Sequence, residues 1–127
     1  MKDKHLYEYA VIRVVPRVER EEFINVGIIM FCKQQKYLKV KYYIPVEKLK
    51  HYCTELAISE LEMHLQSFEK VSRASKDGGR IAAMDVASRF RWLTAVRSSC
   101  IQTSRPHTGY STDLEATLDH LFEDLVL

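Results

Sequence analysis

The sequence predicts an α+β domain, with a three- to four-stranded antiparallel sheet and four helices packed mainly on one face of it. Three observations support this fold class. Three β-rich segments follow one another through residues 7–44 with short connections, and helical periodicity dominates the rest of the chain. The chain has 127 residues, of which 46% are apolar, so it is long enough for one core. We therefore expect residues 1–127 to form a single domain.

Three segments in the first third of the chain have the composition of strands. Residues 7–15 are rich in β-branched and aromatic side chains. Residues 24–32 are apolar on both alternating faces, which predicts a central strand covered on both sides. Residues 37–44 alternate apolar side chains with Lys39 and Lys41, as expected where one face is buried and the other is wet. The short connections favour an up-down-up meander.

The second half of the chain predicts four helices, which carry apolar side chains at spacings of three and four. These helices span residues 46–52, 58–71, 82–96 and 113–127. Thr112 and Glu115 have the spacing of a capping box at the start of the last one. Residues 97–104 predict a short strand that joins the sheet. Residues 105–110 predict a loop, because they contain a proline and a glycine.

Composition and charge exclude several classes of protein. The net charge of +2 is too small to indicate a nucleic-acid-binding protein by itself. The three cysteines are widely spaced, which favours a reducing cytoplasm over a disulfide scaffold. Residues 1–5 lack the apolar core of a signal peptide, and no apolar run approaches the roughly 20 residues of a membrane span. The scattered histidines lack zinc-ligand spacing, so we expect a cytoplasmic protein without metal, cofactor or membrane segment.

The most distinctive segment is residues 21–27, at the start of the second strand. Gly27 costs stability inside a central strand unless another group approaches the backbone there. The amide of Asn25 needs hydrogen-bond partners among its buried neighbours. Two interpretations remain open. One is a shallow pocket over Gly27, rimmed by Asn25, Glu22 and Arg13. The other is structural, with Glu22 paired to Arg13 across strands and Gly27 making room for a helix.

A second candidate is the segment Arg89-Phe90-Arg91-Trp92 in the third predicted helix. An arginine beside an exposed aromatic side chain can stack on a base or bind phosphate. The alternative places Trp92 mostly in the core, with Arg91 reaching the acidic last helix. The hydroxyls of residues 97–104, with Cys100 and His107, match no nucleophile motif, so we do not predict catalysis there.

Three blocks of the sequence carry a resemblance to a known family. They are residues 9–16 (YAVIRVVP), 22–28 (EFINVGI) and 90–95 (FRWLTA), with further matches at 101–104 and 109–122. These blocks are similar to DUF3037, a bacterial family of proteins of unknown function. The resemblance implies a small cytoplasmic bacterial protein with no established reaction, often encoded beside a kinase-like protein of the toxin–antitoxin type. It places six residues at the signature positions of the family: Arg13, Glu22, Asn25, Gly27, Arg91 and Trp92.

Three classes of function remain open. The first is a protein-partner module that uses the sheet edge and the Arg91–Trp92 segment, with the kinase-like protein as its partner. The second is an enzyme that acts on a phosphate-bearing substrate, with Glu22 as acid or base and with Arg13 and Arg91 as anion clamps. This second class requires a pocket that joins those side chains. The third is weak nucleic-acid binding through Lys33, Lys36, Lys39 and Lys41.

The charges are unevenly distributed along the chain. Residues 1–50 contain eleven basic and six acidic side chains, whereas residues 110–127 contain five acidic and no basic ones. The acidic last helix therefore either neutralises the basic sheet or lies away from it and leaves a basic face for an acidic partner.

Overall fold

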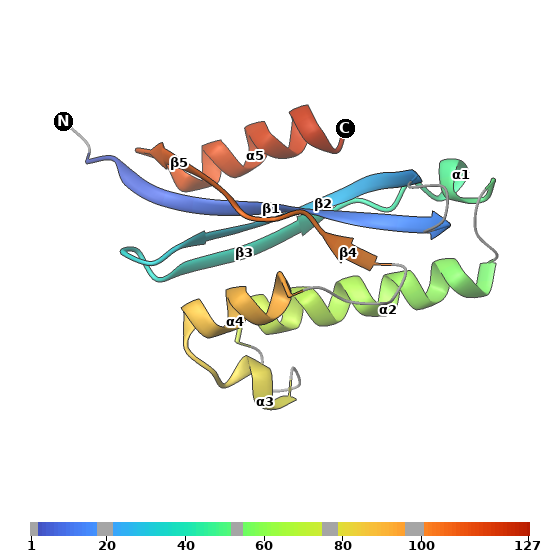
Figure 1. Ribbon diagram of the computed structural model, residues 1–127, viewed down its shortest axis with the longest axis horizontal. Helices are drawn as coiled ribbons and strands as arrows, with labels where there is room; N and C mark the ends of the chain where they lie inside the picture. Colours follow the sequence, from blue (N-terminus) through green and yellow to red (C-terminus); the bar gives the residue numbers. More distant parts are fainter. Residues whose placement is uncertain (1–2, 18–21, 52–54, 75–78, 96–100) are drawn as a thin grey trace.

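The computed structural model describes residues 3–17, 22–51, 55–74, 79–95 and 101–127. They form one antiparallel sheet of five strands with helices on both faces (Figure 1). In chain order the elements are β1 (His5–Arg17), β2 (Glu22–Cys32), β3 (Tyr37–Tyr42), α1 (Val46–Leu49), α2 (Glu55–Ser72), α3 (Gly79–Ala82), α4 (Val86–Leu93), β4 (Ile101–Thr103), β5 (His107–Ser111) and α5 (Leu114–Leu125).

The sheet begins as the predicted meander, in which β1, β2 and β3 pair antiparallel with their neighbours in sequence. The other edge of β1 is shared by two strands, since β4 pairs with Ile12–Val14 and β5 with His5–Tyr9. Ser104 connects the two pairings. Its N–H donates to the Val11 carbonyl, and the Val11 N–H donates to Ser104 Oγ, each over 2.9 Å. The buried hydroxyl of Ser104 therefore replaces a backbone acceptor in the ladder.

The prediction of a loop over residues 105–110 is wrong, because His107–Ser111 form strand β5. Pro106 lies in the gap between β4 and β5, and Gly109 lies within β5, directly opposite Tyr7. A Cβ atom on Gly109 would stand 2.6 Å from the Tyr7 hydroxyl, so the tyrosine ring covers the glycine across the two strands. The glycine that predicted a loop instead marks a close cross-strand contact.

The helices also differ in number from the prediction. The segment 82–96, predicted as one helix, contains the end of α3 and the whole of α4. Asp85 separates the two and caps α4, because its carboxylate accepts the Ser88 N–H over 2.7 Å. This hydrogen bond lowers the pKa of Asp85. The described residues thus form five helices and five strands, and the α+β class is confirmed.

Strand β2 is buried on both faces, as its two apolar faces predicted. Ile29 and Phe31 belong to a core shared with α2 and α4, whereas Ile28 and Met30 pack against α5 on the opposite face. The predicted packing of helices on one face therefore holds for α2 and α4, whereas α5 packs on the opposite face. Helix α5 runs along the upper side of the sheet in Figure 1, opposite α2 and α4.

Helix α5 lies over the lysine face of β3. Lys39 Nζ lies 2.8 Å from a Glu115 carboxylate oxygen, and Lys41 Nζ lies 2.7 Å from one of Asp119. The Tyr37 hydroxyl donates to Glu115 over 3.0 Å. The face of β3 predicted to be wet is thus partly covered by the acidic helix, which neutralises the basic strand. Exposed pairs of this kind contribute little stability, so apolar burial holds α5 and the charges orient it.

Candidate functional site

Two of the predicted site residues, Arg13 and Asn25, lie directly opposite each other on β1 and β2. A bulge in β2 produces this register: Ile12 pairs with Gly27 and Arg13 with Asn25, so Val26 is the extra residue. The bulge brings the Asn25 side chain to the face of the sheet that α5 covers. There its Nδ2 donates to the carbonyl oxygen of Leu125, near the end of α5, over 2.9 Å.

This pair contains two buried polar atoms that lack hydrogen-bond partners among the described residues, Arg13 Nε and Asn25 Oδ1. The guanidinium carbon of Arg13 lies 4.3 Å from the centroid of the Phe23 ring, a cation–π contact. On the other side, Arg13 lies opposite Gln102 of β4. Glu22 lies opposite Arg17 rather than Arg13 in the register, and its side chain lies outside the described part of the structure.

Gly27 is buried in β2, opposite Tyr42 of β3. A Cβ atom there would lie 2.8 Å from the Lys41 carbonyl oxygen, 3.0 Å from Tyr42 Cβ and 3.1 Å from Ile12 Cδ1. These neighbours fill the space in which a pocket over Gly27 was predicted. The glycine makes room for an adjacent strand, rather than for a helix as the structural interpretation proposed.

Arg91 and Trp92 lie on the opposite face of the sheet from Arg13 and Asn25. Arg91 makes a two-fold hydrogen bond with Glu8 of β1, with N–O distances of 3.2 and 3.1 Å, and so does not reach the last helix as predicted. Trp92 is half-buried against the core that lies between α4 and the sheet. Arg13 and Arg91 therefore do not form the two-arginine anion clamp that an enzyme of the second class requires.

A groove lies between the β2–β3 turn and α4, and we name it the turn–α4 groove. It consists of two hollows of about 580 and 250 Å³ that share Lys33 and Ala87. Most of its exposed lining surface is apolar, although six of the ten lining residues are charged. The lining residues are Leu6, Glu8, Phe31, Lys33, Lys36, Asp85, Val86, Ala87, Arg89 and Arg91.

The cations of this groove differ in their bonding. Arg89 is held in place, since its guanidinium donates to the carbonyl oxygens of Met84, Val71 and Ser72 and so caps the end of α2. By contrast, Lys33 and Lys36 have no acidic partner among the described residues. The sequence identified these lysines, but the apolar lining comes from three separate segments and could not be recognised from it.

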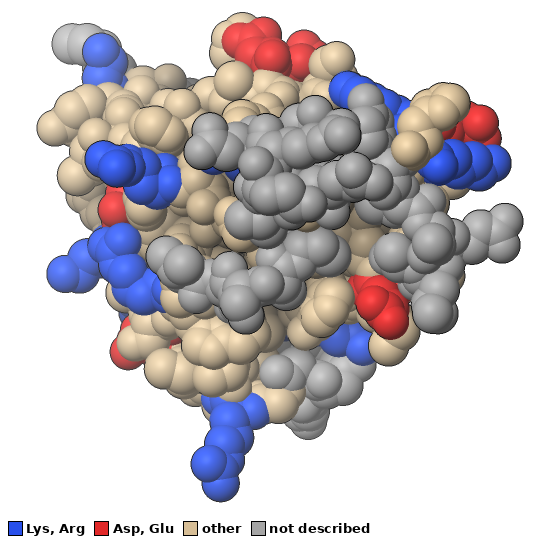
Figure 2. All heavy atoms as spheres, turned by 45° about the vertical axis from the view of Figure 1, so that its right-hand side comes forward, with Lys and Arg blue, Asp and Glu red and all other residues tan. Residues whose placement is uncertain are grey.

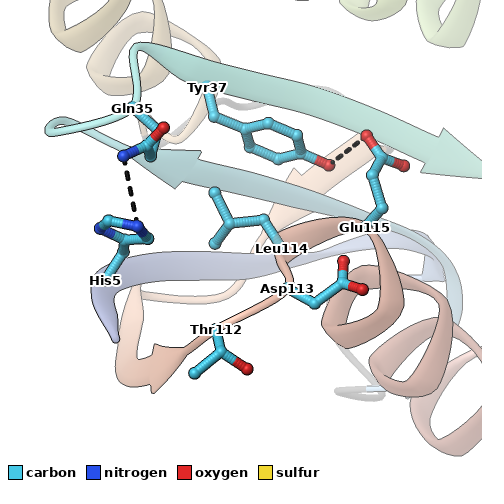
Figure 3. Close-up of a pocket in the computed structure, with 7 residues that line it drawn as sticks. All are labelled: His5, Gln35, Tyr37, Thr112, Asp113, Leu114 and Glu115. Carbon is cyan, nitrogen blue, oxygen red and sulfur yellow. Dashed lines mark hydrogen bonds between the residues drawn. The ribbon is translucent and has the colours of Figure 1, made fainter. Parts of the chain in front are cut away.

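A third hollow, of about 560 Å³, lies at the start of α5 (Figure 3). Four of its polar side chains are paired with one another: Gln35 Nε2 contacts His5 Nε2 over 3.3 Å, and the Tyr37 hydroxyl donates to Glu115. Burial, together with the hydrogen bond and charge of Glu115, raises the pKa of Tyr37, so this hydroxyl stays protonated and remains a donor. The Tyr37–Glu115 hydrogen bond in this hollow joins β3 to α5.

Among the described residues, no group of three or more His, Cys, Asp or Glu side chains is placed so that it could hold a metal ion. The Thr103 hydroxyl donates to the Thr94 carbonyl oxygen, and residues 96–100 lie outside the description. Of the cysteines, Cys32 is a buried free thiol, and Cys53 and Cys100 lie outside the description. None of the described helices is both long and apolar enough to span a bilayer.

Comparison with known proteins gives one match. The family described as "Protein of unknown function (DUF3037)" matches residues 9–126, which is nearly the whole chain. Searches of curated proteins and of solved structures gave no match.

Proposed function

This chain belongs to the DUF3037 family of proteins of unknown function, and we propose that it is a binding module for a protein partner that docks in the turn–α4 groove. The proposal depends on one observation: the groove has an apolar base, which we call its floor, and lysines beside it whose charge no acidic side chain of the described residues neutralises. Phe31 and Ala87 belong to the floor, and Lys33 and Lys36 stand beside it without acidic partners among the described residues.

The positive charge of the groove indicates which kind of partner segment would bind there. An apolar floor with free ammonium groups at its rim fits a partner segment that carries an apolar side chain flanked by carboxylates. The family resemblance makes a kinase-like protein of the toxin–antitoxin type the first partner to test. Nucleic acid fits less well, because Lys39 and Lys41 are paired with α5. Figure 2 shows Lys and Arg in separate groups on one face, with acidic side chains between them and one acidic cluster at the top of the view.

The first test reverses the two free charges. We expect the double variant Lys33→Glu/Lys36→Glu to lose at least about tenfold in affinity for a purified kinase-like protein of the type that the family resemblance implies, measured by calorimetry. A fluorescein-labelled peptide with one leucine flanked by aspartates should show the same loss by fluorescence anisotropy. The control variant, Lys48→Glu/Lys50→Glu, makes the same charge change on α1, at the other end of the molecule (Figure 1).

The outcomes separate the alternatives. Equal affinities of the two double variants would contradict docking in the groove. Peptide binding without binding of the kinase-like protein would support the groove and reject that partner. An oligonucleotide that binds more tightly than the peptide, with affinity that falls steeply as salt rises, would support the nucleic-acid class instead.

A second prediction concerns the ion pair of Glu8 and Arg91. Arg91→Gln and Glu8→Gln break the same pair, in which Arg91 is exposed and Glu8 is half-buried, so each should lower the free energy of unfolding by about 1 kcal/mol. Their effects on partner affinity should have opposite signs, because one removes a positive charge from the groove and the other removes a negative one. Calorimetric titration with the acidic peptide measures both. A weaker affinity in both variants would mean that the pair acts only through structure.

A further inference from the structure

The outer edge of β5 carries no charged side chain to keep another strand away. Strand β5 pairs with β1 on one side and with none of the described strands on the other. It contains no Lys, Arg, Asp or Glu, and both Thr108 and Tyr110 are exposed. At the opposite edge of the sheet, β3 contains Lys39 and Lys41, and lysines on an edge strand discourage pairing with another chain. Of the two edges, β5 is therefore the one open to a further strand.

The register of the sheet shows which peptide groups of β5 point outward. In an antiparallel pair, alternate residues direct their N–H and C=O toward the partner strand. On β1, Val11 directs both groups toward the segment that joins β4 to β5, and Tyr7, four residues earlier, faces the same way. Gly109 lies opposite Tyr7, so its peptide groups point toward β1. Its neighbours Thr108 and Tyr110 therefore direct their N–H and C=O to the free edge.

We propose that a second copy of this chain pairs with this edge, so that two β5 strands run antiparallel about a two-fold axis at Gly109. This register puts Thr108 of each copy opposite Tyr110 of the other. Each outward N–H then donates to a carbonyl oxygen of the other copy. Gly109 has no side chain to obstruct the approach of the two strands at the axis. The two sheets thereby become one continuous sheet.

The charges beside this edge are complementary between two copies in the same register. Arg105 lies four residues before Gly109 and Asp113 four residues after it, so the axis brings Arg105 of each copy near Asp113 of the other. Both residues are exposed, and Arg105 has no acidic partner among the described residues. A two-fold pairing of β3 would instead put Lys39 opposite Lys41 of the other copy, and like charges in opposite positions destabilise a sheet.

Tyr110 supplies the apolar contact of this edge. Its side chain is 71% exposed and lies opposite Leu6 of β1, which is 50% exposed. In the paired sheet the ring lies beside Thr108 of the other copy, and aromatic and β-branched side chains in opposite positions stabilise antiparallel strands. Because the paired segments are short, we expect a dissociation constant of about 10–500 µM. The axis is perpendicular to the sheet, so both turn–α4 grooves of the dimer open on one face.

Sedimentation equilibrium of the full chain from roughly 5 µM to 1 mM tests the pairing. We expect the mean mass to rise from 14.9 kDa toward twice that value. Tyr110→Asp should weaken the association at least about tenfold, because it removes the ring and brings two like charges together across the axis. The matched control Tyr43→Asp changes another exposed tyrosine, directly after β3, and should associate as the wild type does. A wild type that stays at 14.9 kDa throughout, or equal association of the two variants, overturns the proposal.

Disulfide formation tests the register. Thr108→Cys and Tyr110→Cys are prepared as separate variants, since the Cα atoms of opposite residues lie about 5.5 Å apart, within reach of a disulfide. An oxidised mixture of the two should yield a disulfide between positions 108 and 110 of different copies, identified by mass spectrometry. A higher yield of cross-linking at the substituted position in either variant alone would place the axis elsewhere and contradict the proposal. The groove variant Lys33→Glu/Lys36→Glu should form the dimer unchanged, so this pairing and the function proposed for the groove fail independently.

Discussion

Gly27→Val should destabilise the protein by at least about 3 kcal/mol, the upper end of the cost of overpacking a core. The first atom of the new side chain would lie 2.8 Å from the Lys41 carbonyl oxygen, which belongs to the backbone of β3. This oxygen cannot turn away as a side chain can, so β3 must move from β2. The same Cβ atom would also lie 3.0 Å from Tyr42 Cβ and 3.1 Å from Ile12 Cδ1, so the two further methyl groups of valine add to an already crowded position.

Urea unfolding followed by circular dichroism measures this loss, and Gly27→Ala should show a smaller one of about 1–2 kcal/mol. Gly109→Ala is the matched control. Its new Cβ would also meet an atom at 2.6 Å, but this atom is the hydroxyl at the end of the Tyr7 side chain, which can rotate. A Gly27→Val variant as stable as Gly109→Ala would show that β3 does not approach β2 as described.

Phe90→Ala should cost about 3–5 kcal/mol and should also weaken partner binding. Phe90 is fully buried in α4, and its ring stacks on Phe31 of β2 with 4.9 Å between the ring centroids. Phe31 lines the turn–α4 groove. Removal of the Phe90 ring therefore leaves a cavity under one wall of the groove and loosens α4 against the sheet.

Leu118→Ala provides the control for the expected effect of Phe90→Ala on partner binding. Leu118 is also fully buried, but in the core under α5 on the opposite face, and its loss should cost about 2–5 kcal/mol. Urea unfolding gives both stabilities, and fluorescence anisotropy with the acidic peptide gives the affinities under conditions where both variants are folded. A loss of affinity in Phe90→Ala but not in Leu118→Ala links the groove to the packing of α4. Equal affinities in both would show that the groove does not depend on this ring.

Local patterns in the sequence predicted most of the fold. Alternation in residues 7–44 gave the three strands of the meander, and the two apolar faces of residues 24–32 correctly implied cover on both sides. Strand β5 was missed because its pairing depends on a distant partner. The contact of Gly109 with Tyr7 joins residues about a hundred positions apart, and no local pattern reports it.

The candidate site was predictable only in part, for a related reason. Asn25 was selected because a buried amide needs partners, and the structure indeed leaves its Oδ1 without one among the described residues. Asn25 faces Arg13 because of the bulge at Val26; in a regular ladder Arg13 would face Val26. The sequence does not report the register, so the expected partner of Arg13 was Glu22, which instead faces Arg17. Similarly, the Arg91 partner on β1 could not be inferred, because Glu8 meets α4 only in the folded chain.

The shared edge of β1 has a consequence for how the chain folds. The hydrogen bonds between Val11 and Ser104 join residues 93 positions apart in the sequence. Closing this long loop lowers the entropy of the chain before the contacts of β4 and β5 with β1 have formed to stabilise it. The β1–β2–β3 hairpins need only nearby residues, so they can form early. Until residues 101–111 pair with β1, one edge of this apolar strand is unpaired and can pair with another chain. Folding speed and resistance to aggregation thus depend on a segment that contributes only two short strands.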